Sequence, residues 1–306
     1  MNYHASSTAR RTLCAWTLTI LGLIAVASQI MAGETNTSSS YERGVANMNS
    51  REWKEAITNF TEAVRGNPKD ALAYQYRGAA FILTGNYDNA INDFTRALQI
   101  NPTNSEAMCN RAGAYRCKRD FDSAINDLNN ALRLNPTNNV AYKSRADSYS
   151  EKGEFEKAIT DWNEGLRLGP NDAQALAVRG YAYSKTSQFK KAVQDYHEAI
   201  QLDPQSDRAL NNLAWLRATC PSAEMCNGKE AVELATKACE LTNWNRWDWI
   251  DTLAAALAEA GDFKNAIKYE KQAMETSSAT EPYRKEMQRC LSLYEKQQPN
   301  HEGEKR

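Results

Sequence analysis

Small and apolar residues recur at helical spacing through most of the chain. Two such faces lie in the stretch 71–102: Tyr74, Gly78 and Phe81, and then Ala90, Ile91, Phe94, Ala97 and Leu98. Gly85-Asn86 interrupts the pattern between the two faces. Pro102 ends the second helix because proline lacks an amide hydrogen and disfavours helix at the residue before it. The pattern predicts a hairpin of two amphipathic helices, neither of which can bury its apolar face alone.

The hairpin recurs every 34 residues over five consecutive repeats without a gap. Four columns keep this step: Pro68, Pro102, Pro136, Pro170 and Pro204; Ala56, Ala90, Ala124, Ala158 and Ala192; Phe60, Phe94, Leu128, Trp162 and Tyr196; and Gly44, Gly78, Ala112, Ala146 and Gly180. The small column lies in the first helix of each repeat and the bulky column in the second. The repetition predicts a stack of hairpins in which each covers the apolar face of its neighbour.

These columns resemble the tetratricopeptide repeat (TPR). The resemblance implies an all-α fold, a TPR α-solenoid in which helix-turn-helix repeats form a right-handed superhelix, with the first helices lining a concave groove. It covers about residues 37–280, or about seven repeats, and the sixth has a longer loop at 219–229. A last helix over 281–296 is expected to be the C-terminal capping helix, and residues 297–306 to form a disordered tail.

Proteins of this family are interaction modules, so the resemblance implies a protein or peptide partner. In co-chaperones of the family, lysines, asparagines and an arginine grip an acidic C-terminus, and of the corresponding positions only Asn110 matches. The last two repeats are similar to the C-terminal part of a group of bacterial exported TPR proteins. The resemblance therefore implies the bacterial exported type and leaves the partner open.

A charged pair of columns runs inside the array. The first helices carry Arg43, Arg77, Arg111, Arg145 and Arg179, and the second helices carry Asn59, Asp93, Asp127, Asp161 and Asp195. Repeats six and seven lose both columns together, with Leu213 and Leu253 in the arginine positions. We predict that the two columns pair between helices and are largely buried. The alternative is two independent solvated columns.

The N-terminal residues have the features of an export signal. Arg10 and Arg11 precede an apolar run over 13–27, which is too short to span a bilayer and ends in an A-x-A cleavage pattern. We expect residues 1–27 to be a signal peptide and 28–36 a linker. The alternative is an uncleaved membrane anchor. Both interpretations place the repeats outside the cytoplasm, in the periplasm or cell envelope of a bacterium or secreted.

Composition and motifs argue against catalysis. The net charge is −1 and no long run of like charge occurs, which argues against a nucleic-acid partner. The three histidines are scattered, and phosphate-binding glycine loops, nucleophile elbows, C-x-x-C and H-E-x-x-H motifs are all missing from the sequence. We therefore expect no catalytic residue, no cofactor and no metal site.

Seven cysteines are too many to pair completely. Cys109 and Cys117 lie eight residues apart on one helix, about 12 Å, which is beyond the reach of a disulfide. Only Cys220 and Cys226, on either side of the long loop in the sixth repeat, are placed to form one. A bridge and two free thiols both remain open at this point.

In a stack of such hairpins, the first-helix residues that face away from the small–aromatic stripe point into the groove. These are Tyr76, Asn110, Lys143, Asp147, Tyr181, Asn212 and Trp215. The mixture of rings, amides and both charge signs suits a peptide and does not suit a phosphate group. The alternative is that they are ordinary solvated residues without a ligand.

A second function is suggested by a cluster of tryptophans: Trp244, Trp247 and Trp249, with Trp215 nearby. Flat aromatic rings stack on sugar faces, so the cluster suggests a module that binds a cell-envelope polysaccharide. The alternative is that the rings pack the irregular sixth and seventh repeats. Three exposed rings in one patch would favour the sugar-binding function, and burial would remove it.

Overall fold

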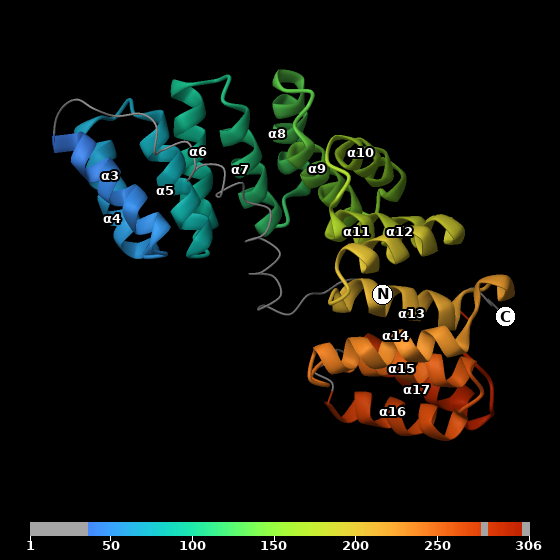
Figure 1. Cartoon of the computed structure of the whole chain (residues 1–306). Coiled ribbons are helices and arrows are strands. Elements are labelled where there is room, and N and C mark those ends of the chain that lie inside the picture. The colour runs from blue at the N-terminus through green and yellow to red at the C-terminus, as the bar shows by residue number, and fades with distance from the viewer. Residues whose placement is uncertain (1–35, 277–280, 302–306) are drawn as a thin grey trace. The chain divides into compact units, whose positions relative to one another are not determined.

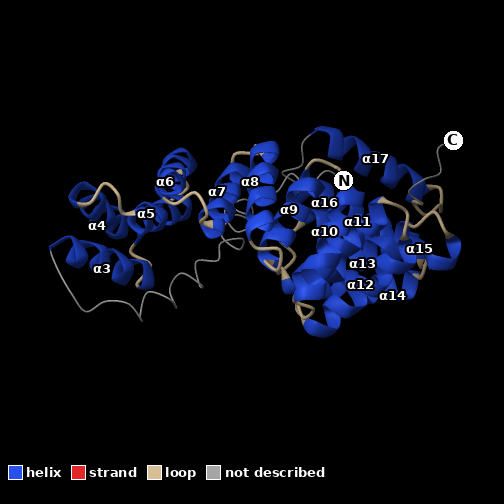
Figure 2. Ribbon diagram, turned by 90° about the horizontal axis from the view of Figure 1, so that it is seen from above, coloured by secondary structure: helices blue, strands red, loops and turns tan. Residues whose placement is uncertain are grey.

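The structure is a computed structural model that describes residues 36–276 and 281–301 (Figure 1). The expected signal peptide and nearly all of the linker lie outside the described residues. Within the described part, every regular element is helical (Figure 2). The chain divides into two compact units, residues 1–168 and 169–306, called here the N-terminal unit and the C-terminal unit.

The helices follow the predicted hairpins. In the N-terminal unit they are α3 (Asn36–Asn49), α4 (Trp53–Gly66), α5 (Ala71–Leu83), α6 (Tyr87–Ile100), α7 (Ser105–Cys117), α8 (Phe121–Leu134), α9 (Asn139–Glu151) and α10 (Phe155–Leu168). In the C-terminal unit they are α11 (Ala173–Lys185), α12 (Phe189–Leu202), α13 (Asp207–Thr219), the 3-10 turn η1 (Ala223–Met225), α14 (Gly228–Leu241), α15 (Trp247–Glu259), α16 (Phe263–Thr276) and α17 (Glu281–Glu295). Each odd-numbered helix from α3 to α13 is the first helix of a hairpin. This is the all-α solenoid expected from the repeat pattern.

Local signals set the ends of the first helices. At the N-termini of α5, α7, α9, α11 and α13, an aspartate, asparagine or serine side chain accepts a hydrogen bond from the backbone N–H three residues later. These N-cap residues are Asp70, Asn104, Asn138, Asp172 and Ser206. The short turn inside the regular hairpins contains a left-handed residue, such as Gly85 (φ 78°) in one repeat and Arg119 (φ 64°) in the next. The left-handed conformation costs a residue with a Cβ atom about 1–2 kcal/mol, so the turn at Arg119 is less stable than the turn at Gly85.

The small and bulky columns meet inside each hairpin. A Cβ atom added to Gly78 would lie 3.0 Å from Cζ of Phe94, and one added to Gly180 would lie 2.9 Å from Cε1 of Tyr196. Phe94 and Tyr196 are buried. The glycine in the first helix is therefore what lets the ring of the second helix lie against the backbone.

The arginine and aspartate columns pair as predicted. Arg111 donates to Asp127 through both Nε (2.7 Å) and Nη2 (2.8 Å). The same two-pronged contact joins Arg77 to Asp93, Arg145 to Asp161 and Arg179 to Asp195. The aspartates are buried, and the hydrogen bond to Asp127 is the largest cause of the raised pKa of Arg111.

The third nitrogen of the same arginines reaches the preceding hairpin. Nη1 of Arg77 donates to Thr61 Oγ1 (3.2 Å), and Nη1 of Arg111 donates to Thr95 Oγ1 (2.9 Å). Nη1 of Arg145 donates to Asn129 Oδ1 in the same way (2.7 Å). One guanidinium group thus joins three helices, two of its own hairpin and the second helix of the one before.

The C-terminal unit departs from the repeat where the paired columns end. Leu213 and Leu253 are buried in place of arginine, and an apolar cluster that includes Trp249 and Ile250 fills α13 to α15. In the bulky column, α16 carries Glu270, which is fully buried. Burial raises the pKa of Glu270, and the neighbouring carboxyl group of Asp251 raises it further.

The cysteines of the long loop and the residues after α17 have defined surroundings in this unit. Of the two alternatives for the loop, the structure has free thiols at Cys220 and Cys226, and Sγ of Cys226 donates to the carbonyl oxygen of Cys220 (3.2 Å). In the described part of the expected tail, residues 297–301, Asn300 is buried and its side chain bonds to Cys290 and Arg289. Among the described residues, no helix combines the length and the apolar character needed to cross a bilayer.

We predict that Asp127→Ala lowers the free energy of unfolding by about 3–5 kcal/mol, because it leaves the partly buried guanidinium of Arg111 without its carboxylate. The double variant Arg111→Leu with Asp127→Leu is expected to lose clearly less. Urea unfolding followed by circular dichroism measures both. Asp122→Ala is the matched control on the same helix, because its pair with Lys152 is exposed and contributes little. Equal losses in the single and double variants would contradict the prediction.

Glu270 predicts a pH-dependent stability. The folded chain holds the Glu270 proton more tightly than the unfolded chain, whose carboxyl pKa is near 4.5. Raising the pH through and above that value therefore destabilises the fold. Glu270→Gln removes the titrating group, so we expect its melting temperature to fall less than that of the native chain between about pH 5 and pH 9. An equal fall in melting temperature for the two proteins between about pH 5 and pH 9 would argue against a buried, protonated Glu270.

Candidate functional site

The first helices form a continuous layer within each unit. Each first helix contacts the next one directly, whereas successive second helices make at most scattered contacts. In the N-terminal unit this layer consists of α3, α5, α7 and α9, and in the C-terminal unit of α11, α13 and α15. Closer packing on one side curves a stack of hairpins toward that side. The first-helix layer is therefore the candidate binding face of each unit.

Two of the residues expected on this face are buried instead. The ring of Tyr76 is 4% exposed, stacks on Phe60 at 5.6 Å between centroids and meets the edge of Tyr41 at 5.6 Å. Asn110 is 1% exposed. Phe60 and Tyr41 of the preceding hairpin cover the Tyr76 ring, so Tyr76 belongs to the interface between repeats. Buried as they are, Tyr76 and Asn110 offer little surface to a ligand.

Lys143 and Asp147 are half-buried and engaged with neighbouring helices. Cγ of Lys143 lies 2.8 Å from where a Cβ atom of Gly165 would stand, so its stem packs against α10. The Asp147 carboxylate accepts from Nη2 of Arg116 at 3.0 Å, which joins α9 to α7. The expected groove residues of the N-terminal unit thus fix neighbouring helices to each other.

The polar residues that join the first helices were not singled out from the sequence. The buried side chain of Gln75 accepts from Nδ2 of Asn104, the N-cap of α7, at 2.7 Å. Glu106 follows on α7, where burial raises its pKa and the Gln75 amide partly offsets that rise. Arg116 completes the set through Asp147. The repeat pattern could have pointed to Gln75, Glu106 and Arg116, since they lie near the expected groove residues on the same helices. It does not show which residues they bond to.

Three expected residues retain surface in the C-terminal unit. Tyr181 on α11 and Asn212 and Trp215 on α13 are each half-buried. The ammonium group of Lys185 lies 5.4 Å from the centre of the Tyr181 ring, and Trp215 packs its other side on the apolar cluster of α13 to α15. Helices α11 and α13 are in contact. Two aromatic rings and an amide thus lie half-buried on adjacent first helices.

The tryptophans after α14 serve packing. Trp249 is buried, donates from Nε1 to Asp207 at 3.1 Å and lies under the guanidinium of Arg246 at 4.0 Å. Trp244 stacks on Tyr269, and Trp247 meets the edge of Tyr283. The patch of three exposed rings that a sugar platform requires is not formed by these residues, because Trp249 is buried and its neighbours are half-buried.

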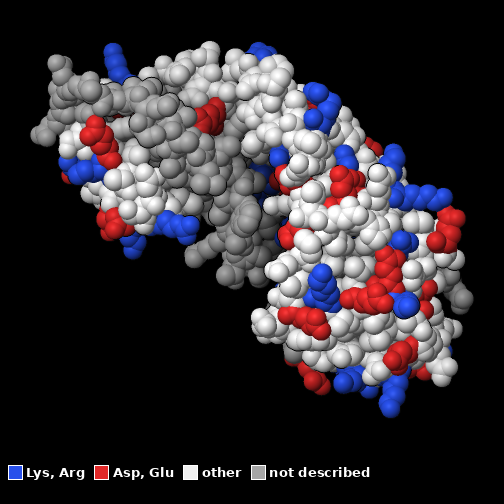
Figure 3. All heavy atoms as spheres, in the orientation of Figure 1, with Lys and Arg blue, Asp and Glu red and all other residues white. Residues whose placement is uncertain are grey.

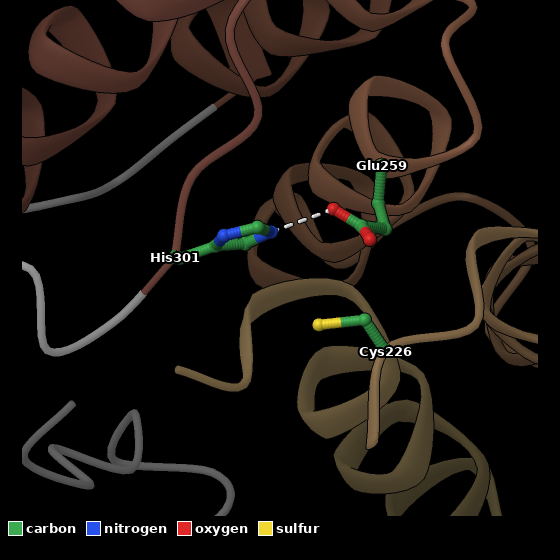
Figure 4. A group of neighbouring side chains, drawn as sticks. All are labelled: Cys226, Glu259 and His301. Atoms are coloured by element: carbon green, nitrogen blue, oxygen red, sulfur yellow. Dashed lines mark hydrogen bonds and ion pairs between the residues drawn. The ribbon is translucent and has the colours of Figure 1, made fainter. Parts of the chain in front are cut away.

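The described residues also bring together a group that the sequence did not indicate: Cys226, Glu259 and His301 (Figure 4). Their ligand atoms all lie within 4.8 Å of one another, and Nε2 of His301 is 2.8 Å from Oε2 of Glu259. Burial is the largest cause that raises the pKa of the Cys226 thiol to about 11, and the Glu259 carboxylate adds to it. Our expectation that the chain has no metal-ligand group rested on the scatter of its histidines along the sequence.

The charged surface is mixed. On the face drawn in Figure 3, acidic and basic side chains are interspersed over the described residues. The formal net charge of the whole chain is −1. The described residues on that face form no contiguous positive patch of the kind on which phosphate backbones are bound.

Family comparisons agree with the repeat geometry. The family model described as "Tetratricopeptide repeat" matches residues 71–104 and 173–206, and a second one with the same description matches 105–138. A model described as "TPR repeat" matches 146–187. No curated protein matches the chain.

Several solved structures of MamA are similar to the chain. One is 21% identical with a TM-score of 0.51, and the alignment covers 55% of this chain and 92% of MamA. Residues 41 to the end of MamA from Desulfovibrio magneticus RS-1 are 18% identical with a TM-score of 0.53, covering 57% of this chain and 99% of that one. A double mutant of the RS-1 protein gives 18% and 0.54 with the same coverage. At these identities the likeness shows a shared fold.

Proposed function

Because the chain is a tetratricopeptide repeat protein, we propose that it is a non-enzymatic scaffold that binds a peptide or partner protein on its first-helix layer. The observation that carries the proposal is the layer itself, in which first helices pack side by side and present a continuous face. A repeat array of this kind offers an extended surface for binding. The family and the fold support a protein-interaction scaffold, and the position of the partner is our inference.

Within that layer, the face formed by Tyr181, Asn212 and Trp215 is our choice of binding surface. Both aromatic rings are half-buried: Tyr181 lies beside the ammonium group of Lys185, and Trp215 packs on the apolar cluster of α13 to α15. Rigid, half-buried aromatic residues are the typical anchors of protein interfaces. Asn212 adds an amide that can pair with the backbone of an extended or helical peptide.

The structure does not show the exposed tryptophan patch that suggested a polysaccharide-binding function. That function rested on a group of exposed tryptophans, and the described structure uses Trp244, Trp247 and Trp249 to pack α15 against α13, α16 and α17. We therefore place the scaffold function first.

We also propose that the repeats work outside the cytoplasm. The support is the sequence pattern over residues 1–27, in which two arginines precede a 15-residue apolar run and an A-x-A pattern. A scaffold in the periplasm or cell envelope would meet partners of the envelope. If the run stays attached as an anchor, the same face is held near the membrane.

For the binding face, we predict that Tyr181→Ala and Trp215→Ala each weaken the partner complex by more than about 1 kcal/mol, as the loss of an anchor ring does. The partner is first captured by cross-linking in the envelope of the producing cells, and the affinity of the purified pair is then measured. Leu202→Ala is the matched control, since Leu202 is an exposed apolar residue on the second helix α12. Circular dichroism checks the folding of each variant. Native affinity in both aromatic variants would move the site away from this face.

For the location, we expect N-terminal sequencing of the protein purified from its native cells to begin near Ser28. Cleavage after Ala27 removes both arginines and the apolar run. Arg10→Glu with Arg11→Glu is expected to slow export, because the positive n-region orients the signal. Full-length chain recovered from the cytosol of wild-type cells would contradict the proposed location.

A further inference from the structure

Three side chains with metal-ligand chemistry meet where the C-terminal unit ends. Cys226 lies in the loop before α14, Glu259 is the last residue of α15, and His301 follows α17 (Figure 4). The three ligand atoms lie within 4.8 Å of one another, and all three residues are half-buried. One thiol, one carboxylate and one imidazole from three separate segments thus converge on one point.

The loop that carries Cys226 is held against the end of α15. A Cβ atom on Gly228 would stand 2.5 Å from the backbone nitrogen of Ala260, so only glycine permits this approach. Arg217 fixes the other side, because its Nη1 donates to the carbonyl oxygen of Met225 at 3.0 Å and its own carbonyl accepts from Asn227. The position of the thiol beside Glu259 therefore follows from packing on both sides of the loop.

The segment that carries His301 is held as firmly. Asn300 is 2% exposed, accepts from Nη2 of Arg289 at 2.7 Å and contacts Sγ of Cys290 at 3.5 Å. These contacts fix Asn300 against α17, one residue before His301. His301 is thereby directed at Glu259, with Nε2 2.8 Å from Oε2.

We propose that Cys226, Glu259 and His301 bind a divalent cation of the zinc class. Thiolate, imidazole and carboxylate are all zinc ligands, with bonds of about 2.0–2.3 Å, and ligand atoms on a common tetrahedral ion lie about 3–4 Å apart. Side-chain adjustments within the present spacing satisfy that geometry. The sulfur and nitrogen donors disfavour magnesium and calcium, which take oxygen ligands.

The binding step balances without an added reactant. The proton of the Cys226 thiol is released to solvent when the cation binds. The imidazole of His301 binds the cation through Nε2 as a neutral ring, with its proton on Nδ1. The neighbouring charge of Arg217 is already matched by Glu230, whose Oε2 is 2.9 Å from Nε of Arg217. Three protein ligands leave the fourth position of a tetrahedral ion to water or to a group of a partner.

The test uses the full, untagged chain, reduced and stripped with a chelator, and titrates Zn²⁺ against a chromophoric zinc indicator. We expect Cys226→Ser and His301→Ala each to lower the zinc affinity of this site more than about tenfold, the scale seen even for outer-shell changes. His197→Ala is the matched control, because His197 also lies near a glutamate of this unit, Glu230 at 3.4 Å, and has no thiol beside it. Native zinc affinity in both ligand variants overturns the proposal.

A second measurement separates loss of the ion from loss of the fold. Zn²⁺ is expected to slow alkylation of Cys226, read by peptide mass spectrometry, and to leave the half-buried thiol of Cys109 unaffected. It is also expected to raise the melting temperature of the native chain and of His197→Ala, but not that of Cys226→Ser or His301→Ala. Without metal, the melting temperatures of these two variants are expected to match that of the native chain. Equal alkylation of Cys226 with and without Zn²⁺ refutes the site, and Mg²⁺ in place of Zn²⁺ is expected to give no protection.

Discussion

The buried arginine–aspartate fork is the interaction on which the regular repeats depend. A buried carboxylate is tolerated only with a matched cation and satisfied hydrogen bonds, and Arg111 supplies both to Asp127. The remaining guanidinium nitrogen bonds Thr95 of the preceding hairpin, so the same side chain sets the distance within a hairpin and the step between hairpins. The glycine–ring contact beside it could be satisfied by several apolar combinations. The planar guanidinium group bonds a carboxylate in few orientations. The fork therefore fixes the spacing and orientation of the helices more than it adds to the free energy of unfolding.

Where the forks stop, apolar packing takes over and the geometry becomes irregular. Leucines replace the arginines in the last two repeats, and tryptophans fill the wider spaces around α15. The bulky column ends in Glu270, a buried carboxyl group that lies beside Asp251. The irregular end is also the only described part where segments distant in sequence converge with thiol, imidazole and carboxylate groups together.

The periodic part of the fold was predictable and the non-periodic part was not. A 34-residue step identifies helices, hairpins and the pairing of Arg77 with Asp93, because all of these repeat. It also shows which way Tyr76 points, but not that the preceding hairpin covers that direction, since coverage depends on the tilt between repeats. His301 and Glu259 are separated by 42 residues and belong to no column. Their contact follows from how the chain after α17 folds back, for which the sequence carries no repeated signal.

The polar residues between the first helices connect this architecture to binding. Gln75 with Asn104, and Arg116 with Asp147, hold neighbouring first helices at fixed spacing in the N-terminal unit. A layer fixed in this way loses little conformational freedom when a peptide binds, so more of the contact energy appears as affinity. Side chains that bond one helix to the next are not available to bind a ligand. In the C-terminal unit the proposed contacts belong to the half-buried rings of Tyr181 and Trp215. The residues proposed to bind thus differ in kind from the polar residues that fix the first helices of the N-terminal unit.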